Sequence, residues 1–154
     1  MKRQTIALVA HDNRKKDLIE WVEFNKASLL NHKLVCTGTT GRMVEAALLQ
    51  NRSKHEPKPD ITLLKSGPLG GDQQLGAFIC EGKVDLLIFL WDPMQPQPHD
   101  VDVKALLRIS SLYNIPTATN RSTADFIISS TLFGTDYEPQ VKSFSEYLGR
   151  NVEI

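Results

Sequence analysis

The sequence alternates short apolar runs with longer segments in which apolar residues recur every three or four positions. This alternation constrains the fold more than any other feature, because it is typical of parallel strands connected by helices. The apolar runs predict strands at residues 5–10, 34–36, 61–64, 85–91 and 115–119. Since 154 residues are about the size of one domain, we expect a single α/β domain over residues 1–154 with a mainly parallel sheet.

The segments between these runs predict the helices. A first helix is expected to follow Asp12 or Asn13, either of which could cap it, and to include Leu30. Further helices are expected to include residues 43–48 and 75–79 and to span 101–113 and 144–151, with a short helix or turn at 124–129. Prolines make residues 51–60 an exposed, irregular connection and residues 93–98 a stiff loop.

The charge balance argues against two classes of partner. Eighteen Lys and Arg residues balance eighteen Asp and Glu residues, so we expect neither nucleic acid nor a membrane surface as a partner. The apolar runs are far shorter than the roughly 20 residues that span a bilayer, and the N-terminus lacks the pattern of a signal peptide. The chain is therefore expected to be cytoplasmic.

The cysteines and histidines do not form a metal-binding pattern. Cys36 and Cys80 have no pairing pattern and no nearby ligand residues, so we expect two buried free thiols. His99 and Asp100 form one His-Asp pair, but a metal site of that kind needs further histidines nearby. His32 and His55 cannot supply them, because neither follows a predicted strand. We therefore expect no metal site.

Polar residues follow every predicted strand. In an open parallel sheet, ligands bind beyond the carboxyl ends of the strands. Residues 11–12, 37–40, 66–72, 92–102 and 119–120 occupy that position. We expect all five loops to meet at one edge of the sheet and to form one site.

Two of these loops combine hydroxyl side chains with glycine, where free N–H groups of a following helix favour an anion. Their residues are Thr37, Gly38, Thr39 and Thr40 in the first loop and Ser66 and Gly67 in the second. The alternative for the first loop is a threonine cap and a glycine turn. Lys15, one helical turn beyond His11, could reach the same anion or lie in solvent. Neither loop is a Walker or dinucleotide motif, so a phosphate monoester fits best.

Other side chains of this edge could act on the bound molecule. Asp72 follows two glycines, which would allow close approach of a substrate, and is either a general base or a helix N-cap. His99 could polarise a carbonyl while Asp100 and Asp102 cap the next helix and orient its ring. These parts suit proton abstraction next to a carbonyl in a small phosphorylated ketose, with His99 or His11 stabilising the enediolate.

Several blocks of the chain together resemble the methylglyoxal synthase family. They are residues 9–12 (VAHD), 37–41 (TGTTG), 66–74 (SGPLGGDQQ), 91–93 (WDP), 98–100 (PHD), 102–108 (DVKALLR) and 118–120 (ATN). The resemblance implies a three-layer, Rossmann-like fold with five strands. It implies elimination of phosphate from dihydroxyacetone phosphate, through an enediolate, to give methylglyoxal without a cofactor. It also implies a homohexamer inhibited by phosphate.

The resemblance assigns roles to individual residues. Asp72 would take a proton from the substrate and His99 would polarise its carbonyl. The substrate and its phosphate would be held by His11, Lys15, Thr37, Gly38, Thr39, Thr40, Ser66 and Gly67, and the site would be supported by Asp12, Gly71, Asp92 and Asp102. Arg108 and Arg150 would make contacts between subunits. The connection at 51–60 is longer than the family pattern, which puts subunit contacts or regulation in doubt rather than the chemistry.

Two other functions fit parts of the same pattern. A non-catalytic regulatory domain of the same fold, like the allosteric domain of carbamoyl phosphate synthetase, would bind small anions without needing both Asp72 and His99. A sugar-phosphate isomerase would use the same base but return the proton. Loss of phosphate instead requires the ester C–O bond to stand perpendicular to the enediolate plane.

Overall fold

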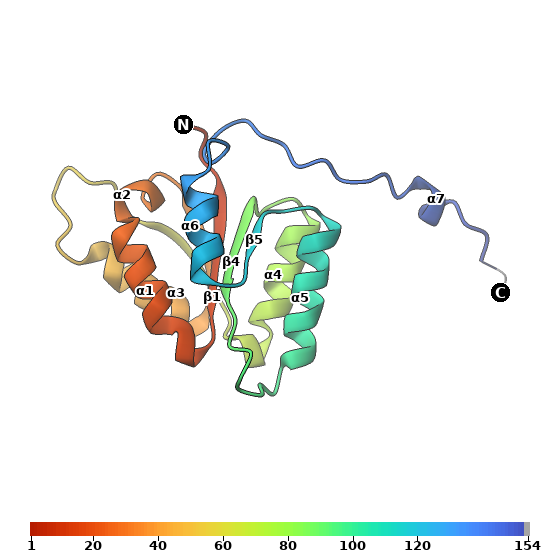
Figure 1. Cartoon of the computed structure of the whole chain (residues 1–154), viewed down its shortest axis with the longest axis horizontal. Helices are drawn as coiled ribbons and strands as arrows, with labels where there is room; N and C mark the ends of the chain where they lie inside the picture. The colour runs from red at the N-terminus through yellow and green to blue at the C-terminus, as the bar shows by residue number, and fades with distance from the viewer. Residues whose placement is uncertain (153–154) are drawn as a thin grey trace.

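A computed structural model describes residues 1–152 and shows an α/β fold in three layers (Figure 1). All strands run parallel in the order β3-β2-β1-β4-β5. Their bounds are β1 Thr5–Ala10, β2 Lys33–Thr37, β3 Asp60–Leu64, β4 Leu86–Leu90 and β5 Thr117–Ala118. The predicted five-stranded parallel sheet is confirmed, with the last strand shorter than expected.

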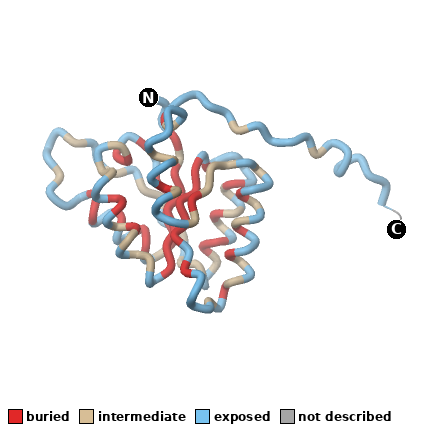
Figure 2. The backbone as a smooth tube through the Cα atoms, in the orientation of Figure 1, coloured by how far each residue is buried: buried red, intermediate tan, exposed pale blue. Residues whose placement is uncertain are grey.

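Seven α-helices and two 3₁₀ turns are described. They are α1 Lys15–Phe24, α2 Lys26–Leu29, α3 Gly38–Leu49, α4 Gly71–Cys80, α5 Asp100–Leu112, α6 Arg121–Ser129 and α7 Ser145–Leu148, with η1 Asp12–Arg14 and η2 Gly67–Leu69. Buried side chains of α1, α3 and α6 pack on one face of the sheet, and those of α4 and α5 pack on the other. Figure 2 shows the buried backbone concentrated between these layers.

The central strand explains why its apolar residues run without interruption. β1 lies between β2 and β4, with Ile6 opposite both Leu34 and Leu86. Ile6 and Leu8 pack with one helical layer, whereas Ala7 and Val9 pack with the other. Because both faces of β1 are covered, every position from Ile6 to Ala10 is buried and apolar.

The expected first helix differs from the observed one at both ends. Neither Asp12 nor Asn13 caps it: Arg14 occupies the N-cap position of α1, and the Asp12 carboxylate instead accepts a hydrogen bond from Lys15 Nζ at 2.5 Å. The helix ends at Phe24, and the Trp21 carbonyl accepts hydrogen bonds from both the backbone N–H of Asn25 at 3.1 Å and its side-chain amide at 2.8 Å. Leu30 therefore follows a separate short helix, α2.

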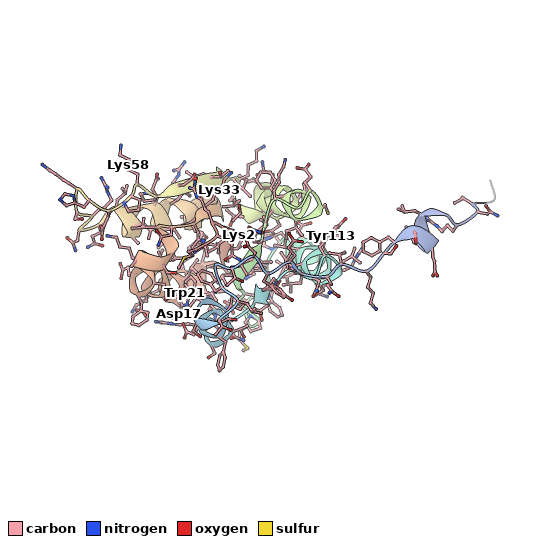
Figure 3. All side chains as sticks on the ribbon, turned by 90° about the horizontal axis from the view of Figure 1, so that it is seen from above. Lys2, Asp17, Trp21, Lys33, Lys58 and Tyr113 are labelled. Atoms are coloured by element: carbon pink, nitrogen blue, oxygen red, sulfur yellow. The ribbon has the colours of Figure 1, made fainter. Side chains whose placement is uncertain are left out.

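Later elements also depart from the expected bounds. The short segment predicted at 124–129 is a helix that begins at Arg121, because the Asn120 side chain accepts a hydrogen bond from the Thr123 N–H at 2.9 Å and caps it. The last helix, α7, spans only Ser145–Leu148. Residues 50–59 contain no helix or strand, as expected, and Lys58 points outward from them (Figure 3).

The two cysteines have different environments. Cys36 is buried, as expected, and burial raises the pKa of its thiol to about 12. Cys80 is exposed, so the prediction of two buried thiols is wrong. The reason is that α4 buries Leu75 and Ile79, which share one helix face, and Cys80 follows at the next position on a different face.

The C-terminal segment first returns to the N-terminus and then leaves the body of the molecule. Gly134 makes two hydrogen bonds to the segment before β1: its carbonyl accepts from the Lys2 N–H at 2.8 Å, and its N–H donates to Gln4 Oε1 at 3.0 Å. Beyond this point the chain extends away from the sheet and carries α7 (Figures 1 and 3). None of the described helices is long and apolar enough to cross a membrane.

Candidate active site

An open cavity of about 230 Å³ lies at the carboxyl ends of β1, β2 and β3 and is bounded on one side by the loop before α5. Every residue predicted to be catalytic or to bind substrate lines it. The full lining is Val9, Ala10, His11, Asp12, Lys15, Thr37, Gly38, Thr39, Thr40, Ser66, Gly67, Pro68, Asp72, Gln97 and His99. Four of the five loops expected at this edge therefore meet.

The fifth loop does not join them. Thr119 and Asn120 line a separate hollow with Arg14 and Arg121. The side-chain oxygen of Asn120 is occupied by the N–H and hydroxyl of Thr123 at the start of α6. The reason is the strand order: β5 lies at the edge of the sheet, separated from β1 by β4.

The two loops that carry hydroxyl side chains, residues 37–40 and 66–67, are the first and second hydroxyl loops. The first leaves the Thr37 side chain available to a ligand. Thr37 occupies the N-cap position of α3 but, within residues 1–152, makes no capping bond through its side chain. Thr40 donates to the Ala10 carbonyl at 3.3 Å, which ties the loop to β1. Gly38 has φ +35°, and a Cβ there would lie 2.7 Å from the Cα of Ser66. This glycine therefore lets the two hydroxyl loops touch.

The glycines before Asp72 serve the backbone rather than the approach of a substrate. Gly70 has φ +102°, a conformation that favours glycine. The N–H of Gly71 donates to the Ser66 carbonyl at 2.9 Å, and a Cβ at Gly71 would lie 2.0 Å from the Lys65 carbonyl oxygen. The sharp turn fixes the first residue of α4 against the second hydroxyl loop, and Asp72 follows directly.

Lys15 brings a positive charge to the same cavity. Its ammonium group donates to the Ala10 carbonyl at 3.2 Å and to the Asp12 carboxylate at 2.5 Å, and its side chain is 16% exposed. The hydrogen bond from Lys15 lowers the pKa of Asp12. The lysine is thus held at the cavity by two oxygens rather than lying free in solvent.

Asp72 and His99 form a buried pair. Asp72 Oδ2 lies 2.6 Å from His99 Nδ1, and the two side chains are 1% and 8% exposed. Gly70, not Asp72, is the N-cap of α4. A Cβ at Gly67 would lie 2.6 Å from His99 Cε1, so this glycine makes room for the imidazole. The other oxygen, Asp72 Oδ1, is buried and has no hydrogen-bond partner among the described residues.

The orientation of His99 corrects one expectation. Asp100 was expected to orient the ring, but its carboxylate accepts a hydrogen bond from the Gln97 N–H at 3.0 Å. Asp102 lies inside α5, where its N–H donates to the His99 carbonyl at 2.9 Å. The ring is held by Asp72, which the sequence separates from it by 27 positions. Neither Asp100 nor Asp102 lines the cavity.

His11 is held from the opposite side. Its Nδ1 accepts a hydrogen bond from the Asp92 backbone N–H at 3.1 Å. The Asp92 carboxylate is in turn anchored by the Asn13 side chain and the Met94 N–H, both at 3.0 Å, and these bonds lower the pKa of Asp92. Burial lowers the pKa of His11, and its Nε2 has no partner within residues 1–152.

These contacts define what the site can do. Next to hydroxyls, a lysine and the first turn of α3, it combines a carboxylate oxygen and an imidazole nitrogen that have no partner among the described residues. A base and a donor to a developing oxyanion can therefore act on one small anionic molecule. In residues 1–152, no three His, Cys, Asp or Glu side chains are grouped so as to hold a metal ion.

The sequence did not indicate that Gln97 or Asn13 belongs to the site, although Asn13 is one of the two candidate caps of the first helix. Gln97 lines the cavity and Asn13 anchors Asp92. Their signal was weak because glutamine in a proline-rich loop and asparagine before a helix are both ordinary. Gly71 and Asp92 support the site from outside its lining, through the turn and the bond to His11.

Comparisons with known proteins agree on one family. The model of the MGS-like domain matches residues 17–119. A methylglyoxal synthase of Maridesulfovibrio salexigens is 56% identical over 98% of this chain and 99% of its own, and one of Oleidesulfovibrio alaskensis is 52% identical over 96% and 95%. The crystal structure of methylglyoxal synthase from Elizabethkingia anophelis superposes with a TM-score of 0.86 at 45% identity, covering 98% of this chain and 93% of that one.

Proposed function

The chain belongs to the methylglyoxal synthase family, and from this premise we propose that it eliminates phosphate from dihydroxyacetone phosphate to give methylglyoxal, with no cofactor. As a family member it is a carbon–oxygen lyase. One observation carries the detailed proposal: Asp72 Oδ1 and His11 Nε2 are both buried without a hydrogen-bond partner among residues 1–152, and both residues line the cavity. Buried polar atoms are rarely left without a partner unless a ligand supplies one.

We assign the proton abstraction to Asp72. The carboxylate would take a proton from the hydroxymethyl carbon of the ketone through Oδ1, since Oδ2 is engaged by His99. The electron pair of the broken C–H bond then forms the carbon–carbon double bond of an enediolate. His99 belongs to the same catalytic unit because it holds the Asp72 carboxylate. The negative oxygen of the enediolate also needs a hydrogen-bond donor, which the N–H of a histidine of the cavity would supply.

The hydroxyl loops and Lys15 would hold the phosphate and stabilise it as it departs. Thr37, Thr39 and Ser66 present hydroxyls at the cavity, and the first turn of α3 adds free backbone N–H groups. This grip favours elimination if it holds the ester C–O bond perpendicular to the plane of the enediolate. The π electrons can then expel phosphate, whereas an in-plane bond would be retained.

The experiment that tests the activity is direct. The purified protein is incubated with dihydroxyacetone phosphate, and inorganic phosphate and methylglyoxal are measured. We expect the two products in equal amounts without any added metal or cofactor. Glyceraldehyde phosphate as the main product would indicate an isomerase, and binding without any product would indicate a regulatory domain. Either outcome would contradict the proposal.

We also propose a homohexamer that phosphate inhibits. Support for association comes from the C-terminal segment, where Tyr147, Leu148 and Val152 are 63%, 76% and 69% exposed. Support for inhibition comes from the cavity, because a site that releases phosphate must also rebind it. Light scattering measures the mass, and a monomer would contradict the first part. Contacts of Arg108 and Arg150 between subunits and a cytoplasmic location stay predictions.

A further inference from the structure

The two imidazoles of the cavity differ in which nitrogen can carry the hydrogen. The donor to His11 Nδ1 is the backbone N–H of Asp92, at 3.1 Å. A backbone amide always donates, so Nδ1 must present a lone pair. The hydrogen of a neutral His11 therefore lies on Nε2, the atom that is buried without a partner in the described chain.

The opposite holds for His99. Its Nδ1 lies 2.6 Å from Asp72 Oδ2. An ionised carboxylate only accepts hydrogen bonds, so Nδ1 must carry the hydrogen. The Nε2 atom of a neutral His99 is then a bare lone pair that can accept a proton but cannot donate one.

The substrate carries a matching pair of oxygens. Dihydroxyacetone phosphate has a carbonyl oxygen, which only accepts hydrogen bonds, next to a hydroxyl group, which must lose its proton during the elimination. The rings of His11 and His99 face each other nearly at right angles, with centroids 5.6 Å apart. The donor on His11 thus matches the carbonyl oxygen, which accepts a hydrogen bond. The acceptor on His99 matches the neighbouring hydroxyl group, which must lose a proton.

On this basis, and resting on the proposed function, we infer that His11 polarises the carbonyl as a neutral Nε2–H donor, while His99 takes the hydroxyl proton on Nε2. This divides the roles differently from the sequence-based expectation, in which His99 polarises the carbonyl. His11 is the better donor because adding a proton to its Nδ1 would set two donors against each other across the Asp92 bond.

The two steps balance. In the first, the C–H proton goes to Asp72 and its electron pair forms the C=C bond, while His11 stabilises the negative oxygen. In the second, the hydroxyl proton goes to His99, the O–H pair becomes the new C=O bond, the C=C pair shifts to the next carbon–carbon bond, and the C–O pair leaves with phosphate. One proton then returns to the terminal carbon and the other goes to phosphate.

Charged groups around His11 act on its pKa in opposite directions, and burial is the largest influence. His99 and Lys15 disfavour a positive charge on the ring, whereas Asp72 and Asp92 favour it, and burial outweighs them all. Asp12 lies nearby but is engaged by Lys15. A neutral donor suits this step, because it stabilises the oxyanion without handing over the proton that would trap the enediol.

Nitrogen-15 NMR of the histidine-labelled, unliganded protein tests the assignment at a pH where the rings are neutral. We expect hydrogen on Nε2 of His11 and on Nδ1 of His99. His32 is an internal reference, because its Nδ1 also accepts a backbone N–H, from Gln4 at 3.1 Å. Hydrogen on Nδ1 of His11 or on Nε2 of His99 would overturn the inference, even if the enzyme forms methylglyoxal.

Matched glutamine variants give a second readout. Glutamine can donate an N–H but cannot accept a proton as a base. His11→Gln should therefore keep part of the activity, with kcat reduced about tenfold, whereas His99→Gln should lose about 10³-fold. Equal losses or the reverse order would contradict the division of roles. If the unaltered protein forms no methylglyoxal, the proposed function fails but the NMR result still stands.

Discussion

Within residues 1–152, a cavity lies at each end of the sheet, but only the one at the carboxyl ends of the strands combines a lysine and two histidines with aspartates. The cavity at the carboxyl ends has a volume of about 230 Å³, and a second one of about 290 Å³ lies at the amino ends of β1 and β4. The second is lined by apolar side chains such as Ile79, Leu86, Ile127 and Phe133. Volume therefore does not identify the site.

A histidine at each end makes the comparison sharper. His11 follows β1 and His32 precedes β2. Each accepts a backbone N–H at Nδ1 and has a buried Nε2 without a partner in the part of the chain that the structure describes. The ring of His32 packs against Phe133, whereas that of His11 packs against both Phe89 and His99. The two rings differ in what surrounds them: Asp85 and Arg3 act on His32, whereas His11 lies in the cavity beside the Asp72–His99 pair and the first turn of α3.

The largest expected effect comes from removing the base. Asp72→Asn keeps the size of the side chain and can still accept from His99, but it cannot take a proton. We expect kcat to fall by about 10³-fold or more, while phosphate binding measured by calorimetry changes little. Turnover close to normal would show that another group is the base and would remove the main difference between the two ends.

The next effect concerns the turn that carries Asp72. Gly71→Ala places a Cβ 2.0 Å from the Lys65 carbonyl oxygen, so the backbone must shift. We expect a loss of about 2–3 kcal/mol in the free energy of unfolding, together with reduced activity, measured by denaturant titration and assay. The control is Gly76→Ala in the same helix, where nothing lies within 4 Å and we expect a gain of about 0.5–1 kcal/mol. Equal behaviour of the two variants would contradict the model of the turn.

A smaller effect is expected from the lysine of the cavity. Lys15→Met removes a charge held at the cavity but keeps an unbranched, flexible side chain of nearly the same length. We expect KM for dihydroxyacetone phosphate to rise by about 10- to 100-fold, as for loss of a charged hydrogen bond. Lys16→Met alters an exposed neighbour and should leave KM unchanged. A similar change in both variants would show that the effect is one of overall charge.

The smallest effect separates the two histidines by pH. Burial lowers the pKa of His32 below the ordinary 6.5, as it does for His11. The unfolded chain then binds protons more readily, so this contribution to stability is complete above pH 6.5 and is lost as the pH falls towards the folded value. His32→Gln should flatten the fall in unfolding free energy between pH 7 and about 5 without lowering kcat at pH 7. A loss of turnover would show that the amino end also serves the site.

The sequence predicted the parallel sheet and the lining of the cavity, and it could do so for local reasons. Apolar runs buried on both faces reveal strands such as β1 and β4, and glycine with threonine or serine reveals the two loops that follow β2 and β3. It failed where a single side-chain bond decides the outcome. The Asn120 side chain caps the start of α6, and Asp72 rather than Asp100 holds His99.

The sequence thus determined which predicted side chains line the cavity, because the carboxyl ends of parallel strands lie at one edge of the sheet. Only the tertiary structure decided which hydrogen-bond partners those side chains have. The hydrogen position on each imidazole depends on its partner, Asp92 for His11 and Asp72 for His99, and these partners lie 81 and 27 positions away. No local pattern encodes such a contact, since it exists only after the strands have paired.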